Sequence, residues 1–240
     1  WAVGREPSEG ILYDALVDKD FANTLLEAIV RHRHFRGTAG EVVASPTKAL
    51  RSILRAGEGS LEPTVMRVEQ SNTSIAYGDR LILKLFRRPD TGVNPDLEIG
   101  HFLTEKVAFP HIPPVGGLLE YRRKESEPRT LAILQAYVPN QGDAWRYTLD
   151  DLGRFFEGVL AHPEAEAPAF PQKQWLALVH EEIPTLARDL IGPYLESARL
   201  LGQRTGELHL ALASAPEDPA FAPEPFSDLT RRALYHGMIA

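Results

Sequence analysis

A lysine in the middle of an apolar run is the feature that most constrains how this chain can fold. Lys84 is preceded by Leu81-Ile82-Leu83 and followed by Leu85-Phe86. The run has the length and composition of a β-strand. Burying an unpaired ammonium costs several kcal/mol or lowers its pKa. The run therefore predicts either an edge strand that keeps the ammonium in water or a strand whose lysine meets an anionic partner.

The segments on either side supply candidate partners. A small polar stretch between two strand-like runs is made of Ser71, Asn72, Thr73 and Ser74. Downstream, Asn94 and Pro95 predict the start of a helix that carries Glu98. Taken separately, these are an ordinary hairpin turn and a surface glutamate. Together, however, they follow a typical order. A strand, a polar loop, a strand with a lysine and a helix with a glutamate succeed one another in the ATP-binding lobe of protein-kinase-like folds.

This order assigns roles to individual residues. The polar stretch 71–74 would offer hydroxyls and backbone N–H groups to phosphates, and Lys84 would bind the α- and β-phosphates while Glu98 holds it in place. The end of the apolar run 131–138 would be the hinge that contacts adenine. We assign this contact to Gln135, Tyr137 and Val138, with Val68 and Ile82 on the faces of the ring.

Composition excludes several classes of function. The chain has 240 residues, of which 43% are hydrophobic, so one or two globular domains are expected. Its net charge of −7 and the lack of a Lys/Arg-rich block argue against nucleic-acid binding, and the absence of cysteine excludes thiolate chemistry. No apolar run reaches the roughly 18 residues of a membrane span, and the N-terminus does not resemble a signal peptide. We therefore expect a cytoplasmic protein.

The pattern of elements divides the chain into three parts and predicts an α+β fold. Residues 1–60 are expected to be mostly helical, with a helix capped by Asp20 and a linker over 55–60. Residues 61–141 are expected to form an antiparallel sheet with one helix. Residues 142–240 are expected to be mostly helical, because apolar residues recur there at helical spacing.

Several stretches resemble bacterial maltokinases, most closely the maltokinase part that is fused behind trehalose synthase. They are residues 69–74, 77–88, 92–100, 138–145 and 205–212. The fourth of these reads Val138-Pro139-Asn140-Gln141-Gly142-Asp143-Ala144-Trp145. The resemblance extends over most of the chain, from about Gly10 onward.

The resemblance implies both fold and activity. The family has an aminoglycoside-phosphotransferase-like fold, so residues 1–60 would be the end of an N-terminal cap and a linker, 61–141 the ATP-binding lobe, and 142–240 the start of a helical C-lobe. It phosphorylates maltose at the anomeric hydroxyl with ATP and Mg²⁺, and the maltose 1-phosphate feeds glycogen synthesis. The implied partners are maltose and a trehalose synthase domain or subunit.

The family's catalytic loop, His-Gly-Asp, is not found in this sequence. The nearest string is His236-Gly237-Met238, whose methionine cannot act as a base or a metal ligand, and the resemblance places it in a helix before that loop. We therefore expect a fragment that contains neither the catalytic aspartate nor the Mg²⁺ ligands and that binds nucleotide without transferring phosphate. Its last helices would expose an apolar face near Leu208, Leu210 and Leu212, through which a homodimer could form.

Two other functions remain open at this stage. One is a non-catalytic, pseudokinase-like module that binds trehalose synthase. The other is a small-molecule kinase of the same fold that acts on an aminoglycoside, choline or another sugar. The string 140–145 after the hinge favours the maltokinase hypothesis over a generic kinase of this fold. The choice between ATP and GTP is not determined by these residues.

Overall fold

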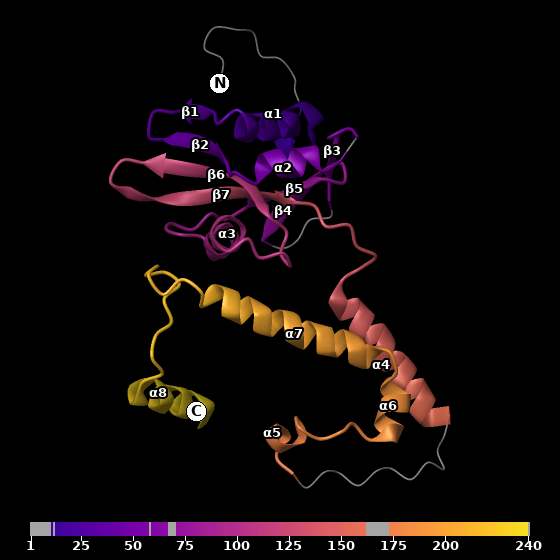
Figure 1. Ribbon diagram of the computed structural model, residues 1–240. Helices are drawn as coiled ribbons and strands as arrows, with labels where there is room; N and C mark the ends of the chain where they lie inside the picture. The colour runs from indigo at the N-terminus through magenta and orange to yellow at the C-terminus, as the bar shows by residue number, and fades with distance from the viewer. Residues whose placement is uncertain (1–10, 12, 58, 67–70, 162–172, 240) are drawn as a thin grey trace. The chain divides into compact units, whose positions relative to one another are not determined.

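The computed structural model describes residues 11, 13–57, 59–66, 71–161 and 173–239. Contacts divide the chain into two compact units, Trp1–Pro139 and Asn140–Ala240. Figure 1 shows the first unit as a sheet with helices and the second as a set of helices. The α+β class with an antiparallel sheet is thus confirmed. The assignment of segments to a cap, an ATP lobe and a C-lobe stays a prediction.

The first unit is built on a seven-stranded sheet in which every neighbouring pair is antiparallel. Its order is β1-β2-β6-β7-β5-β4-β3. The strands are β1 His34–Arg36, β2 Glu41–Pro46, β3 Pro63–Val65, β4 Asn72–Tyr77, β5 Leu81–Phe86, β6 Val115–Arg123 and β7 Ser126–Ala136. Strands β4 and β5 form the predicted hairpin, and Gly78 in its turn has the positive φ of 58° that glycine accommodates without strain.

The N-terminal segment contributes more than the helices that the sequence predicts. The short element η1 (Ala15–Val17) and helices α1 (Lys19–Val30) and α2 (Leu50–Arg55) come from it. So do β1 and β2, and β2 pairs with β6 along its whole length. Residues 1–60 therefore belong to the same unit as the rest of the sheet. The predicted cap Asp20 is wrong: the side chain of Asp18 accepts from the N–H of Asp20, at 2.8 Å, and from that of Phe21.

Helices α1 and α2 cover one face of the sheet, and their contact with it forms the hydrophobic core. Leu26 and Ile29 of α1 and Leu50 and Ile53 of α2 pack against apolar residues of the strands. Those strand residues are Ile75, Tyr77, Leu81, Leu83, Leu119, Ala132 and Leu134. Their alternation along each strand places the remaining residues of β4, β5 and β7 on the opposite face.

Helix α3 (Pro95–His101) lies on that opposite face, as Figure 1 shows. It continues into a short π-helix, η2 (Phe102–Lys106). Its start is as predicted: Asn94 Oδ1 accepts from the N–H of Leu97 at 3.2 Å, and Pro95 occupies the first turn. Gly100 of α3 lies close to Val115 of β6, which fixes the helix against the sheet.

The second unit is helical, as expected. Its helices are α4 Ala144–Ala161, α5 Trp175–Leu178, α6 Thr185–Ile191, α7 Tyr194–Leu212 and α8 Asp228–Ile239. Tyr194 of α7 stacks on Tyr147 of α4 with ring centroids 5.9 Å apart. His236 and Gly237 lie within α8, which confirms their helical placement. Among the described helices, none combines the length and apolarity needed to cross a bilayer.

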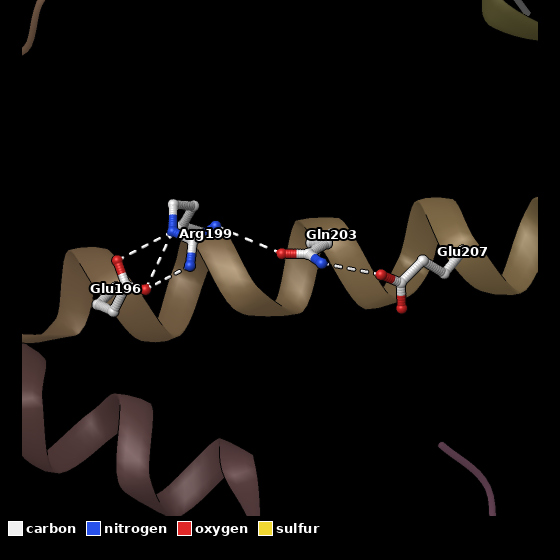
Figure 2. Close-up of polar contacts among 4 residues, drawn as sticks. All are labelled: Glu196, Arg199, Gln203 and Glu207. Atoms are coloured by element: carbon white, nitrogen blue, oxygen red, sulfur yellow. Dashed lines mark hydrogen bonds and ion pairs between the residues drawn. The ribbon is translucent and has the colours of Figure 1, made fainter. Parts of the chain in front are cut away.

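A ladder of polar side chains runs along α7 (Figure 2). Arg199 contacts both carboxylate oxygens of Glu196 and donates to Gln203 Oε1 at 3.3 Å, and Gln203 donates to Glu207 Oε1 at 2.8 Å. The hydrogen bond with Arg199 holds the pKa of Glu196 below its usual range. Contacts at this spacing each stabilise a helix by a few tenths of a kcal/mol, so the ladder reinforces the solvent-facing side of α7.

Candidate functional site

Lys84 lies on an interior strand, which excludes the edge-strand alternative. Strand β5 is hydrogen-bonded to β4 on one side and to β7 on the other, and Lys84 is in register with Ser74 and Ile133. Its neighbour Leu83 is fully buried under α1 and α2. Because side chains alternate along a strand, the half-buried Lys84 belongs to the opposite face, on the same side of the sheet as α3.

Several predicted site residues share the face of Lys84. The cross-strand pairs Asn72↔Phe86, Ser74↔Lys84 and Ile82↔Gln135 alternate with the pairs of the core. The β-sheet therefore gathers Asn72, Ser74, Ile82 and Gln135 around Lys84, although they come from three strands. We call these five residues the Lys84 face. It offers one cation, one hydroxyl and two amides beside an aliphatic side chain.

The polar stretch 71–74 is not the turn that the sequence predicts. Asn72, Thr73 and Ser74 lie within β4, and residues 67–70, Val68 among them, are outside the described part of the chain. Thr73 belongs to the other face, where it is buried and its Oγ1 accepts from Arg87 Nε at 3.1 Å. Ser71 precedes the strand and is exposed, and its carbonyl accepts from the N–H of Arg87.

The predicted ion pair between Lys84 and Glu98 is not formed. Among the described residues, neither side chain has a hydrogen bond or ion pair, although Glu98 is half-buried on α3, on the same side of the sheet as Lys84. The next glutamate, Glu105, has a structural role, because its Oε1 accepts from the N–H of Ala49 at the start of α2 at 3.2 Å. The pairing of Glu98 with Lys84 therefore stays a proposal.

The predicted hinge begins in β7 and leaves the sheet after Ala136. Gln135 pairs with both Ile82 and Val115, so it is fixed in the ladder. The N–H of Tyr137 already donates to the carbonyl of Arg80 at 2.8 Å. This N–H is therefore already engaged within the protein, and the adenine contact of Tyr137 stays a prediction. Val138 is 54% exposed at the end of the first unit.

Arg80, which the sequence reasoning missed, connects this end of the sheet to α2. Its guanidinium donates to the carbonyls of Leu54 at 2.9 Å, Gly57 at 3.0 Å and Gly59 at 2.6 Å. The predicted linker 55–60 is thus hydrogen-bonded at Gly57 and Gly59 to Arg80, the residue before β5. The only available signal was an arginine directly after the Gly78-Asp79 turn, and such a residue is usually solvent-exposed.

We expect Arg80→Met to destabilise the first unit by about 2 kcal/mol, because three carbonyls lose a charged donor. Thermal or urea unfolding would measure the loss. The matched control is Arg123→Met on β6, whose side chain is exposed and which should change stability by less than about 0.5 kcal/mol. Equal stability of the two variants would show that the three hydrogen bonds contribute nothing net.

A pocket of about 620 Å³ adjoins the Lys84 face at Asn72 and Phe86. Its lining also includes Ser71, Arg87 and Arg88, and the carboxylates Asp90 and Asp96. Asn72 Oδ1 is buried, with no hydrogen-bond partner among the described residues. The sequence reasoning did not single out the two arginines of this lining. Lys84 is not among the lining residues, and Arg87 Nε donates to Thr73 on the other face of the sheet.

The described residues contain no cluster of three or more His, Cys, Asp or Glu side chains placed to hold a metal ion. The use of Mg²⁺ stays a prediction.

Comparisons with known proteins found similarity to glucosamine kinases. No family model matches the chain. A curated relative, the glucosamine kinase of Streptacidiphilus jiangxiensis, is 28% identical over 173 residues, which are 66% of this chain and 38% of the relative. The chain thus spans well under half the length of that relative. The similarity is to glucosamine kinases, and the finer resemblance to maltokinases stays a prediction.

Two solved structures were also matched. One is a glucosamine kinase in complex with glucosamine, ADP and inorganic phosphate, with 20% identity and a TM-score of 0.47 over 82% of this chain and 36% of that chain. The other is a second crystal form of a glucosamine kinase, with 18% identity and a TM-score of 0.40 over 80% of this chain and 49% of that one. Both TM-scores are below 0.5, so neither match supports an assignment of the site.

Proposed function

We propose that this chain carries the nucleotide-binding part of an ATP-dependent sugar kinase. The observation that carries the proposal is Lys84, a lysine on an interior strand that faces away from the core and lies in register with Ser74. A half-buried ammonium without a partner among the described residues is explained when an anionic ligand completes its environment. The similarity over 173 residues to a glucosamine kinase supports the same function.

The chemistry follows from what phosphoryl transfer requires. Its transition state spreads negative charge over the transferred group, so catalysis depends on positioning and on neutralising that charge. Lys84 would bind the α- and β-phosphates, and Glu98 would pair with it once a nucleotide is bound. Ser74 and Asn72 would donate hydrogen bonds beside it, and Ser71 would do so from the start of β4. Bound Mg²⁺ would neutralise the β- and γ-phosphates.

The adenine would lie against Ile82, beside Gln135 and the segment that follows β7. With the N–H of Tyr137 engaged by Arg80 and the backbone of Gln135 held in the ladder, the carbonyl of Tyr137 and the backbone of Val138 are the groups that we assign to the base. Carbonyls accept from the exocyclic amine of adenine, which guanine does not present at the equivalent position. This assignment favours ATP over GTP.

For the acceptor we propose maltose, phosphorylated at its anomeric hydroxyl to maltose 1-phosphate for glycogen synthesis, in a cytoplasmic protein associated with trehalose synthase. The motifs 92–100 and 138–145 support this choice. Glucosamine is the alternative acceptor, because the relative is a glucosamine kinase. Incubating the protein encoded by the full reading frame with Mg-ATP and each sugar, and following ADP release, separates the two. Release with glucosamine and not with maltose would overturn the maltose assignment.

Nucleotide binding is tested by titrating the chain with Mg-ATP in a calorimeter. We expect Lys84→Ala to weaken binding at least tenfold. A tenfold loss of affinity corresponds to about 1.4 kcal/mol, which is a modest value for one charge-assisted phosphate contact. Lys124→Ala is the matched control, since Lys124 is exposed in the β6–β7 turn and should leave the affinity unchanged.

Two outcomes would contradict the proposal. Equal affinity of Lys84→Ala and the unsubstituted chain would remove Lys84 from the site. No measurable binding of Mg-ATP by the folded chain would favour the non-catalytic module that binds a trehalose synthase domain. A melting temperature measured for each variant shows that any loss is not caused by unfolding.

A further inference from the structure

A second pocket lies on the other side of the sheet, where α1 ends and α2 begins. It has a volume of about 620 Å³, and its apolar part includes Val30, Pro46 and Leu54. Three cations also line it: Lys48, Arg51 and Arg55. It belongs to the face covered by α1 and α2, opposite the Lys84 face, so a ligand there would not compete with the proposed nucleotide site.

The charge of this pocket is not balanced by the protein. Within the described residues, the side chains of Lys48, Arg51 and Arg55 have no ion pair or hydrogen bond. The pocket lining contains no acidic side chain, although the chain as a whole carries a net charge of −7. Arg51 and Arg55 are one turn apart on α2, and like charges at this spacing disfavour a helix.

Two further charged side chains, Arg31 and Glu105, adjoin the pocket lining through the chain or a hydrogen bond and leave it net positive. Arg31, at the end of α1, is paired with Glu27 at 2.9 Å. Glu105 is held by the N–H of Ala49 at the start of α2, so the backbone at that helix start is already occupied. An anion in the pocket would therefore be bound by the three side chains rather than by the helix terminus.

We propose that this pocket binds a small phosphorylated molecule with one apolar side, such as a sugar phosphate or a nucleotide. Guanidinium groups bind phosphate oxygens in pairs, and the ammonium of Lys48 adds a third positive charge. The apolar wall formed by Val30, Pro46 and Leu54 suits the apolar face of a sugar ring or a base. A volume of about 620 Å³ lies within the range of pockets for ligands of this size.

The test is made in the Lys84→Ala background, so that failure of the proposed nucleotide site cannot be mistaken for failure of this one. The probes are glucose 6-phosphate, ADP and inorganic pyrophosphate, and binding is followed by calorimetry. We expect glucose 6-phosphate or ADP to bind, and pyrophosphate to bind more weakly because it has no apolar part. The stronger of the first two identifies the class of ligand.

Adding Arg51→Gln and Arg55→Gln should weaken binding of the preferred probe at least tenfold, while Arg51→Lys with Arg55→Lys should weaken it less because the charge is kept. The control pair, Arg122→Gln with Arg123→Gln on β6, changes the net charge equally and should leave binding unchanged. Both arginines of the pocket are exposed, so the variants should fold, which a melting curve verifies.

Three results would overturn the proposal. The first is equal affinity in the Arg51→Gln/Arg55→Gln variant, and the second is the absence of binding for all three probes. The third is binding of a glutamate-rich peptide in place of the phosphorylated probes, which would make the pocket a docking site for an acidic protein segment.

Discussion

Gly117→Val should destabilise the first unit by about 3 kcal/mol or more, the upper end of the cost of overpacking a core. A Cβ atom at this position would lie 2.4 Å from Ile29 Cγ2 and 2.8 Å from the carbonyl oxygen of Ser45. The first contact belongs to α1 and the second to the backbone of β2. Because β2 is hydrogen-bonded to β6 at this point, Ser45 cannot move away without breaking the ladder.

The experiment is chemical unfolding of Gly117→Val, Gly117→Ala and Gly37→Ala, followed by circular dichroism. Gly117→Ala should lie between the other two. Gly37, at the end of β1, is the matched control, because a Cβ there meets only the carbonyl oxygen of Gly40, at 3.4 Å, an ordinary van der Waals distance. If Gly117→Val were as stable as Gly37→Ala, α1 and β2 would not be packed on β6 as described.

The parts of the fold with a local signal were predicted from the sequence. The hairpin β4–β5 follows from two β-rich runs around Gly78-Asp79, and α3 follows from Asn94 and Pro95. Strands β1 and β2 were missed because β2 is held by its pairing with β6, which is some 70 residues away in the sequence. A short apolar run such as Val42-Val43-Ala44 carries no periodicity that distinguishes a strand from a buried helix.

Only part of the candidate site could be predicted, because only some of its residues have a local signal in the sequence. Lys84 and Ser74 were predicted from local composition, and the sheet brings them into register. Alternation along β4 separates Thr73 from its neighbours, and the sequence reasoning did not apply that alternation because it took 71–74 as a turn. The hydrogen bond that occupies the N–H of Tyr137 depends on the path of the chain after β7, which no local pattern specifies.

Tyr77→Ala should cost about 3–5 kcal/mol, the range for removing a buried aromatic ring from a core. Tyr77 is completely buried among residues of α1 and of the sheet, and its hydroxyl donates to the carbonyl of Ala22 at 2.6 Å. Tyr77→Phe keeps the ring and removes only this hydrogen bond, so it should cost about 1 kcal/mol. Urea unfolding of both variants separates the contribution of the ring from that of the hydroxyl.

The same pair of proteins predicts how stability depends on alkaline pH. Burial raises the pKa of the Tyr77 hydroxyl above its ordinary value, so the folded state keeps the proton at a pH where the unfolded chain releases it. Stability from this group is therefore complete below pH 10 and is lost above it, at up to about 1.4 kcal/mol per pH unit. Tyr77→Phe lacks the titrating group, and its stability should fall less steeply above pH 10. Parallel pH profiles for the two proteins would mean that the hydroxyl is not buried in the folded state.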